Sequence, residues 1–165
     1  MVLRMAKFSI KTFRKGLREL EREVDLALSS QTDCCGVTIA QCHVLLAVEE
    51  SGEPSVSEIA AVLELDASTL SRTVDGLVKA ELLSRREDPD NRRRQLVSLS
   101  ENGRKKAESI NNLCDMYYSG ILGALPADKV QSIADVLPVF AAAMRDWRKK
   151  QANDDCRRKP AGRAP

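Results

Sequence analysis

The chain has 165 residues, of which 43% are hydrophobic and 4% aromatic, a composition that suits one domain with an aliphatic, mostly helical core. No apolar run approaches the ~20 residues that a membrane span needs, and Arg4, Lys7 and Lys11 interrupt any early signal-peptide segment. We therefore expect a cytosolic protein with no membrane partner. The formal net charge is only +2, but the segment from Ser84 to Lys106 contains eight basic and four acidic residues. Positive charge is therefore concentrated in this segment.

The first predicted helix covers about residues 7–30. Its apolar residues recur at alternating steps of three and four, which is the spacing of a helix that packs along a partner helix. The residues of this seam are Ile10, Phe13, Leu17, Leu20, Val24 and Ala27.

A group of thiols follows this helix. We expect Cys34 and Cys35 in the turn before a helix capped by Thr38, with Cys42 and His43 on its second turn. Thiols near a helix N-terminus are more acidic and bind soft ions. The three cysteines, with His43 as an extra ligand, are thus candidates for a soft metal or metalloid site or for a redox switch. Alternatively, Cys42 is a small buried hydrophobe and His43 an ordinary polar residue.

Two short helices are predicted from Ser55 to about residue 80. Ser55 and Glu58 have the spacing of a capping box, and Asp66 can cap the second helix. The buried stripe of the second helix is Leu70, Val74 and Leu77. Its outward residues include Ser68, Thr69, Ser71 and Arg72. Such a surface is typical of a recognition helix in a DNA major groove, although an ordinary amphipathic helix pair is the alternative.

A β-hairpin is predicted next, with strands at residues 82–86 and 95–99 and a turn at residues 88–91. Arg92, Arg93 and Arg94 come directly after the turn. Because adjacent arginines repel one another, this segment favours an anionic partner, and a narrow DNA minor groove attracts arginine in this way.

The C-terminal region, residues 101–149, is predicted to be helical and carries two further seams. They run from Ala107 to Ile121 and from Val130 to Trp147. One small domain cannot easily bury three such stripes, so we expect a homodimer built from both chain ends, with packing inside a single bundle as the alternative. Residues 151–165 have charge, proline and glycine without periodicity, and are predicted to be a disordered basic tail.

Residues 55–100 resemble the MarR family of winged helix-turn-helix transcription regulators, through the helix D-A-S-T-L-S-R-T-V-D-G-L, the wing D-P-D-N-R-R-R and the strand L-V-S-L-S. The resemblance implies a single domain over residues 1–150. Its fold would be mainly α with a small β-hairpin wing, a winged helix at about 37–100 and dimerisation helices at about 7–30 and 101–149. Arg93 matches the family's minor-groove arginine. Asn91 replaces an aspartate that usually braces it, and Glu81 replaces the glycine that usually ends the recognition helix.

Together these features predict a sequence-specific DNA-binding repressor, a homodimer on double-stranded DNA with a pseudo-palindromic operator. An effector, a soft metal, metalloid or oxidant at Cys34, Cys35 and Cys42, would release it. The alternatives are a regulator that responds to a phenolic or drug-like molecule, with structural cysteines, and a dimeric adaptor that does not bind DNA. No enzyme is expected, because a thiol oxidoreductase would need C-x-x-C spacing, which Cys34-Cys35 lacks.

Overall fold

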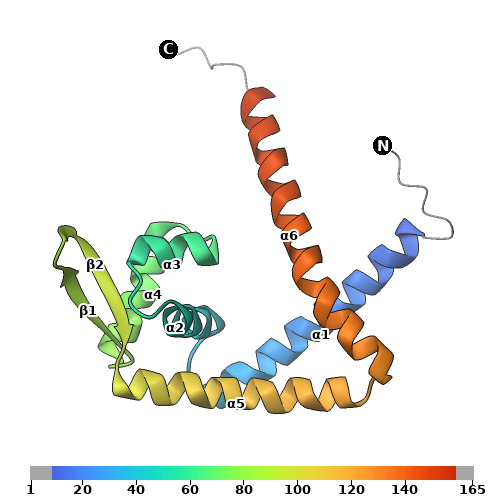
Figure 1. Ribbon diagram of the computed structural model, residues 1–165, viewed down its shortest axis with the longest axis horizontal. Helices are drawn as coiled ribbons and strands as arrows, with labels where there is room; N and C mark the ends of the chain where they lie inside the picture. Colours follow the sequence, from blue (N-terminus) through green and yellow to red (C-terminus); the bar gives the residue numbers. More distant parts are fainter. Residues whose placement is uncertain (1–8, 159–165) are drawn as a thin grey trace. The chain divides into compact units, whose positions relative to one another are not determined.

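The computed structural model describes residues 9–158, except for the side chains of residues 29–35, 92–93 and 153–158. Over these residues the structure consists of helices and one two-stranded antiparallel sheet, a β-hairpin (Figure 1). The elements are α1 (Ile10–Cys35), α2 (Ile39–Ser51), α3 (Val56–Leu63), α4 (Ala67–Lys79), β1 (Leu83–Asp88), β2 (Asn91–Leu99), α5 (Glu101–Gly123) and α6 (Ala127–Arg158). The predicted fold class, mainly α with a small hairpin, is confirmed. The chain divides into two compact units, residues 1–113 and 114–165.

Local capping sets the starts of α2, α3 and α4. Thr38 and Gln41 form a capping box on α2, and Ser55 and Glu58 form the predicted one on α3. Asp66 caps α4, accepting a hydrogen bond of 2.8 Å from the backbone N–H of Thr69. Each cap satisfies amide groups that the first helical turn leaves without partners. The start of α4 is therefore determined by residues close to it in sequence.

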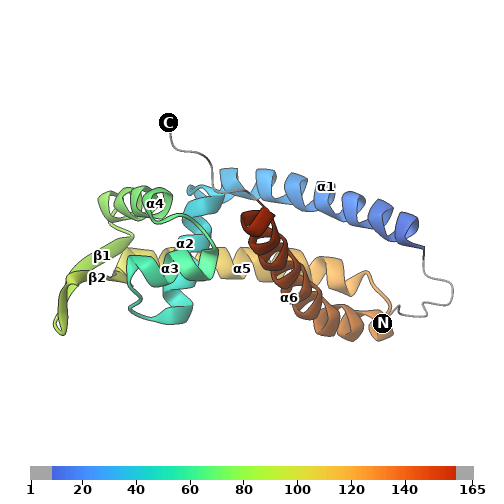
Figure 2. The ribbon, with the colours of Figure 1, turned by 90° about the horizontal axis from the view of Figure 1, so that it is seen from above.

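The core of the first unit lies between these three helices, the hairpin and the start of α5. Its fully buried side chains include Leu45, Val48, Ile59, Leu70, Val74, Leu77, Val97 and Ala107. The predicted stripe of α4 is thus buried. The hairpin is joined to the segment before α3 by a 2.9 Å hydrogen bond from the Val97 N–H to the Pro54 carbonyl. From this anchored base the hairpin extends as an arm beside α3 and α4 (Figure 2).

Two predicted boundaries are wrong. Helix α1 continues to Cys35 and ends at Gly36, whose backbone is left-handed with φ 63°. Cys34 and Cys35 therefore belong to its last turn and not to a connecting turn, because no residue before Gly36 terminates the helix. At the other end, α6 continues to Arg158, past the predicted start of a disordered tail, since the first proline after Gln151 is Pro160. The rest of the predicted tail, 159–165, lies outside the described residues.

None of the helices between residues 9 and 158 combines the length and the apolar composition of a membrane-spanning segment.

Glu81, between α4 and β1, adopts the left-handed conformation that its position in the sequence indicates, with φ 57°. A residue with a Cβ is strained there, whereas glycine is not. We expect Glu81→Gly to raise the free energy of unfolding by about 0.5–1 kcal/mol, measured by urea titration. The matched control is Glu81→Ala, which removes the carboxylate but keeps the Cβ. An equal gain from the alanine variant would mean that the side-chain charge, and not the backbone, is responsible.

Candidate nucleic-acid interface

The N-terminal half of α4 presents a small polar surface. Thr69 and Arg72 are exposed, as predicted, and Ser71 is half-buried. Ser68 is also exposed, but its hydroxyl donates a 2.6 Å hydrogen bond to Oδ1 of Asp66. This bond, together with those from Thr69, holds the pKa of the Asp66 carboxyl well below its usual range. Ser68 therefore supports the helix cap in addition to lying on the predicted contact surface.

A hollow of about 340 Å³ lies between the N-termini of α3 and α4 and the hairpin. Its lining includes Ser55, Ser57, Ala67, Ser71, Arg85 and Arg94. Arg85 projects from β1, and its Nη1 lies 2.6 Å from Oδ1 of Asp75 on α4. Its Nε and Nη2 are buried and have no acceptor among the described residues. The hollow thus combines hydroxyl groups, two helix N-termini and an arginine side chain, which are the components of an anion site.

Arg85 was not among the predicted site residues. A usable signal is nevertheless present in the sequence. Side chains alternate between the two faces of a strand, so Arg85 shares the face of Leu83, which is buried against the helices. An arginine on the strand face that packs against the helices needs an anionic partner, because burying an unpaired charge is costly. This requirement distinguishes Arg85 from the neighbouring arginine.

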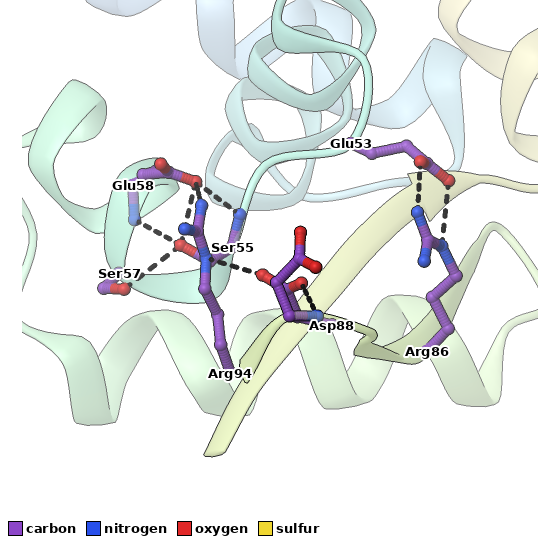
Figure 3. Close-up of polar contacts among 8 residues, drawn as sticks. Glu53, Ser55, Ser57, Glu58, Arg86, Asp88 and Arg94 are labelled. Carbon is purple, nitrogen blue, oxygen red and sulfur yellow. Dashed lines mark hydrogen bonds and ion pairs between the residues drawn. The ribbon is translucent and has the colours of Figure 1, made fainter. Parts of the chain in front are cut away.

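The three predicted wing arginines do not form one set. Arg94 points back to the helices: its Nη2 lies 2.6 Å from Oε2 of Glu58 on α3, and its Nε lies 3.6 Å from Oδ2 of Asp88 (Figure 3). Arg92 and Arg93 occupy the start of β2 next to the turn, and their side chains are outside the described residues. The turn itself is confirmed, with the Asp90 N–H donating to Oδ1 of Asp88 at 3.0 Å.

Two carboxylates before and within α3 receive hairpin arginines. Hydrogen bonds from the backbone and hydroxyl of Ser55, and then from Arg94, lower the pKa of Glu58 to about 2. Arg86 on β1 binds Glu53 through both Nε, at 3.3 Å, and Nη2, at 2.6 Å (Figure 3). This bidentate contact lowers the pKa of Glu53 and raises that of Arg86. Both acids are therefore ionised at neutral pH and remain paired.

The cysteine prediction is not tested by the described side chains. Cys42 is a half-buried thiol on α2 and His43 is exposed, while the side chains of Cys34 and Cys35 lie outside the description. Among the side chains that are described, no group of three or more His, Cys, Asp or Glu residues is arranged to hold a metal ion. The sensing role of the three cysteines stays a prediction.

Comparison with known proteins shows which family this region is similar to. Residues 37–94 match the model of the MarR family. An uncharacterized HTH-type transcriptional regulator of Bacillus subtilis, YhbI, is 31% identical over 72 residues, or 44% of this chain and 47% of that protein. The matched stretches span 47% and 63% of the lengths of two curated relatives, YhbI and YdgJ.

Solved structures share the fold. A MarR mutant of E. coli complexed with operator DNA has a TM-score of 0.66 and 23% identity, covering 78% of this chain and 93% of that one. Streptococcus pneumoniae FabT in complex with DNA has a TM-score of 0.74 and 13% identity, covering 82% and 99%. These relatives and solved structures are transcription regulators and not enzymes, in agreement with the prediction that the chain is not an enzyme.

Proposed function

We propose that this chain, whose residues 37–94 match the model of the MarR family, is a transcription regulator that binds double-stranded DNA through α4 and the hairpin. The observation that carries the proposal is the hollow beside Arg85. The Arg85 guanidinium lies beside the hollow, and its buried Nε and Nη2 have no acceptor in the free protein, so a phosphate in the hollow would be attracted to this positive charge. The N-termini of α3 and α4, which reach this hollow through Val56 and Ala67, favour the same negative charge.

Around this phosphate contact, the recognition surface would read the major groove. Thr69 and Arg72 are exposed on the first two turns of α4, where the recognition helix of this class contacts base edges. The hairpin extends beside this helix and would place its tip, with Arg92 and Arg93, over the neighbouring minor groove. Ser71 lines the hollow and is therefore assigned to the phosphate rather than to a base.

The proposed assembly is a homodimer. The apolar seam of α1 is exposed in the single chain, with Ile10 61% and Leu20 53% accessible. In α6, likewise, Leu137 is 52% and Trp147 65% accessible. Apolar stripes of this length are expected to be covered, and a second copy of the chain offers the same surfaces. A two-fold dimer would read a pseudo-palindrome whose half-sites lie about 10 bp apart.

The proposal is tested by fluorescence anisotropy of the full chain on DNA selected from random sequence, over a series of salt concentrations. Arg85→Gln should weaken binding to every sequence and reduce the slope of log K against log salt by about 1, because one phosphate contact is lost. Asp75→Asn, which breaks the ion pair but keeps the arginine, should leave the slope unchanged. A wild-type chain without salt-dependent DNA affinity would favour the adaptor alternative and contradict the proposal.

A further inference from the structure

We propose that Arg86 and Arg94 are positioning residues that hold the hairpin at a defined angle to α3, and that neither contacts DNA. The inference rests on the proposed DNA binding. The angle of the hairpin affects that binding because the tip of the hairpin must reach a groove of the DNA. It also reassigns Arg94, which the sequence places beside Arg92 and Arg93 as a wing contact.

The first attachment connects β2 to α3. Arg94 binds Glu58 at 2.6 Å, and Glu58 is itself held by the Ser55 N–H at 2.8 Å and the Ser55 hydroxyl at 2.9 Å. Its Nε also lies 3.6 Å from Asp88 at the end of β1. One guanidinium therefore lies between the capping box of α3 and both strands of the hairpin.

The second attachment connects β1 to the segment before α3. Arg86 forms its bidentate pair with Glu53, and Figure 3 shows the two arginines on separate sides of the drawn segment, each turned towards its own carboxylate. Pro54 and Ser55 lie between Glu53 and Glu58 in sequence: the Pro54 carbonyl accepts a hydrogen bond from the Val97 N–H, and Ser55 forms a β-bridge with Leu96. The side-chain pairs at Glu53 and Glu58 flank these backbone bonds, and they add to the restraint that the Arg85–Asp75 pair and the buried Val97 already give the hairpin.

In the competing interpretation, these arginines bind DNA phosphates, and they pair with the carboxylates only when DNA is absent. The two interpretations predict opposite effects of neutralising the acids. If Arg94 contacts DNA, releasing it from Glu58 should strengthen binding. If Arg94 positions the hairpin, the same change should weaken it. Glu58→Gln is the suitable variant, because glutamine also serves at this position of a capping box and the start of α3 is preserved.

The experiment is a double-mutant cycle in the full chain, with Glu58→Gln, Arg94→Gln and both together, measured by anisotropy on the selected DNA. We expect each single variant to weaken binding about fivefold, the double variant to be no weaker than the worse single one, and the salt slope to stay at the wild-type value. Glu53→Gln and Arg86→Gln form a parallel cycle with the same expectation. Urea titrations should show little change in stability, as is usual for exposed ion pairs.

Tighter binding by Glu58→Gln, or a salt slope reduced by about 1 in Arg94→Gln, would overturn the proposal. A readout without DNA separates it from the proposed function. Amide hydrogen exchange at Val97, whose N–H joins the hairpin to Pro54, should be faster in Glu58→Gln and Arg94→Gln than in wild type. If wild type does not bind DNA, the proposed function fails, and this exchange rate alone decides whether the pairs hold the hairpin. An unchanged exchange rate at Val97 in both variants would contradict the proposal that these ion pairs hold the hairpin.

Discussion

Arg93→Ala should weaken binding to operator DNA by about tenfold to hundredfold, the largest loss expected from any single arginine of the hairpin. Arg93 is the third residue of β2 and lies close to the turn at Pro89 and Asp90, at the far end of the hairpin. Arg94 is engaged with Glu58, so minor-groove contact is assigned to the arginines nearer the turn. A narrow minor groove concentrates negative potential, which favours an inserted guanidinium strongly.

The control for this variant is Lys105→Ala, which removes an exposed positive charge on α5 that pairs with Glu101 in the preceding turn of the same helix. Its affinity should stay close to wild type. A second measurement identifies the groove. Replacing A·T pairs by G·C pairs at the positions under the hairpin should weaken wild type and leave Arg93→Ala nearly unaffected. Equal losses in both proteins, or unchanged affinity in Arg93→Ala, would remove Arg93 from the interface.

Features governed by neighbours in sequence could be predicted in this chain. The capping box of Ser55 and Glu58, the cap of Asp66 and the turn at Asp88 each involve residues two or three positions apart, so their hydrogen bonds are available to the local backbone. The stripe of α4 follows in the same way from helical periodicity. These local features determine where α4 starts and which of its faces is exposed.

The different partners of the hairpin arginines could not be predicted, because they depend on contacts between residues that are far apart in sequence. Arg94 and Glu58 are 36 positions apart, and Arg86 and Glu53 are 33 apart. Which carboxylate an arginine reaches is decided by the register of the strands and by the Val97 to Pro54 bond, neither of which follows from residue spacing. Adjacency in sequence alone does not separate Arg94 from Arg92 and Arg93.

The structural connection between hairpin and α5 provides the largest expected effect on stability. Gly103 lies on the first turn of α5, and a Cβ at this position would lie 1.9 Å from the carbonyl oxygen of Leu82. That oxygen accepts a 3.1 Å hydrogen bond from the Ser100 N–H, so it cannot retreat without breaking the bond. Ser100 in turn donates to the Glu81 carbonyl and accepts from the Gly103 N–H. We expect Gly103→Ala to lower the free energy of unfolding by about 3 kcal/mol in urea titrations.

The matched control is Gly76→Ala in α4. There the nearest heavy atom to an added Cβ is Nε2 of Gln41 at 3.7 Å, an ordinary van der Waals contact. Because glycine is unfavourable inside a helix, this second substitution should be neutral or stabilise the protein by about 0.5–1 kcal/mol. The pair therefore separates the close approach of α5 to Leu82 from the general effect of glycine in a helix. If Gly103→Ala were as stable as Gly76→Ala, the start of α5 could not be held against Leu82 by the bonds of Ser100.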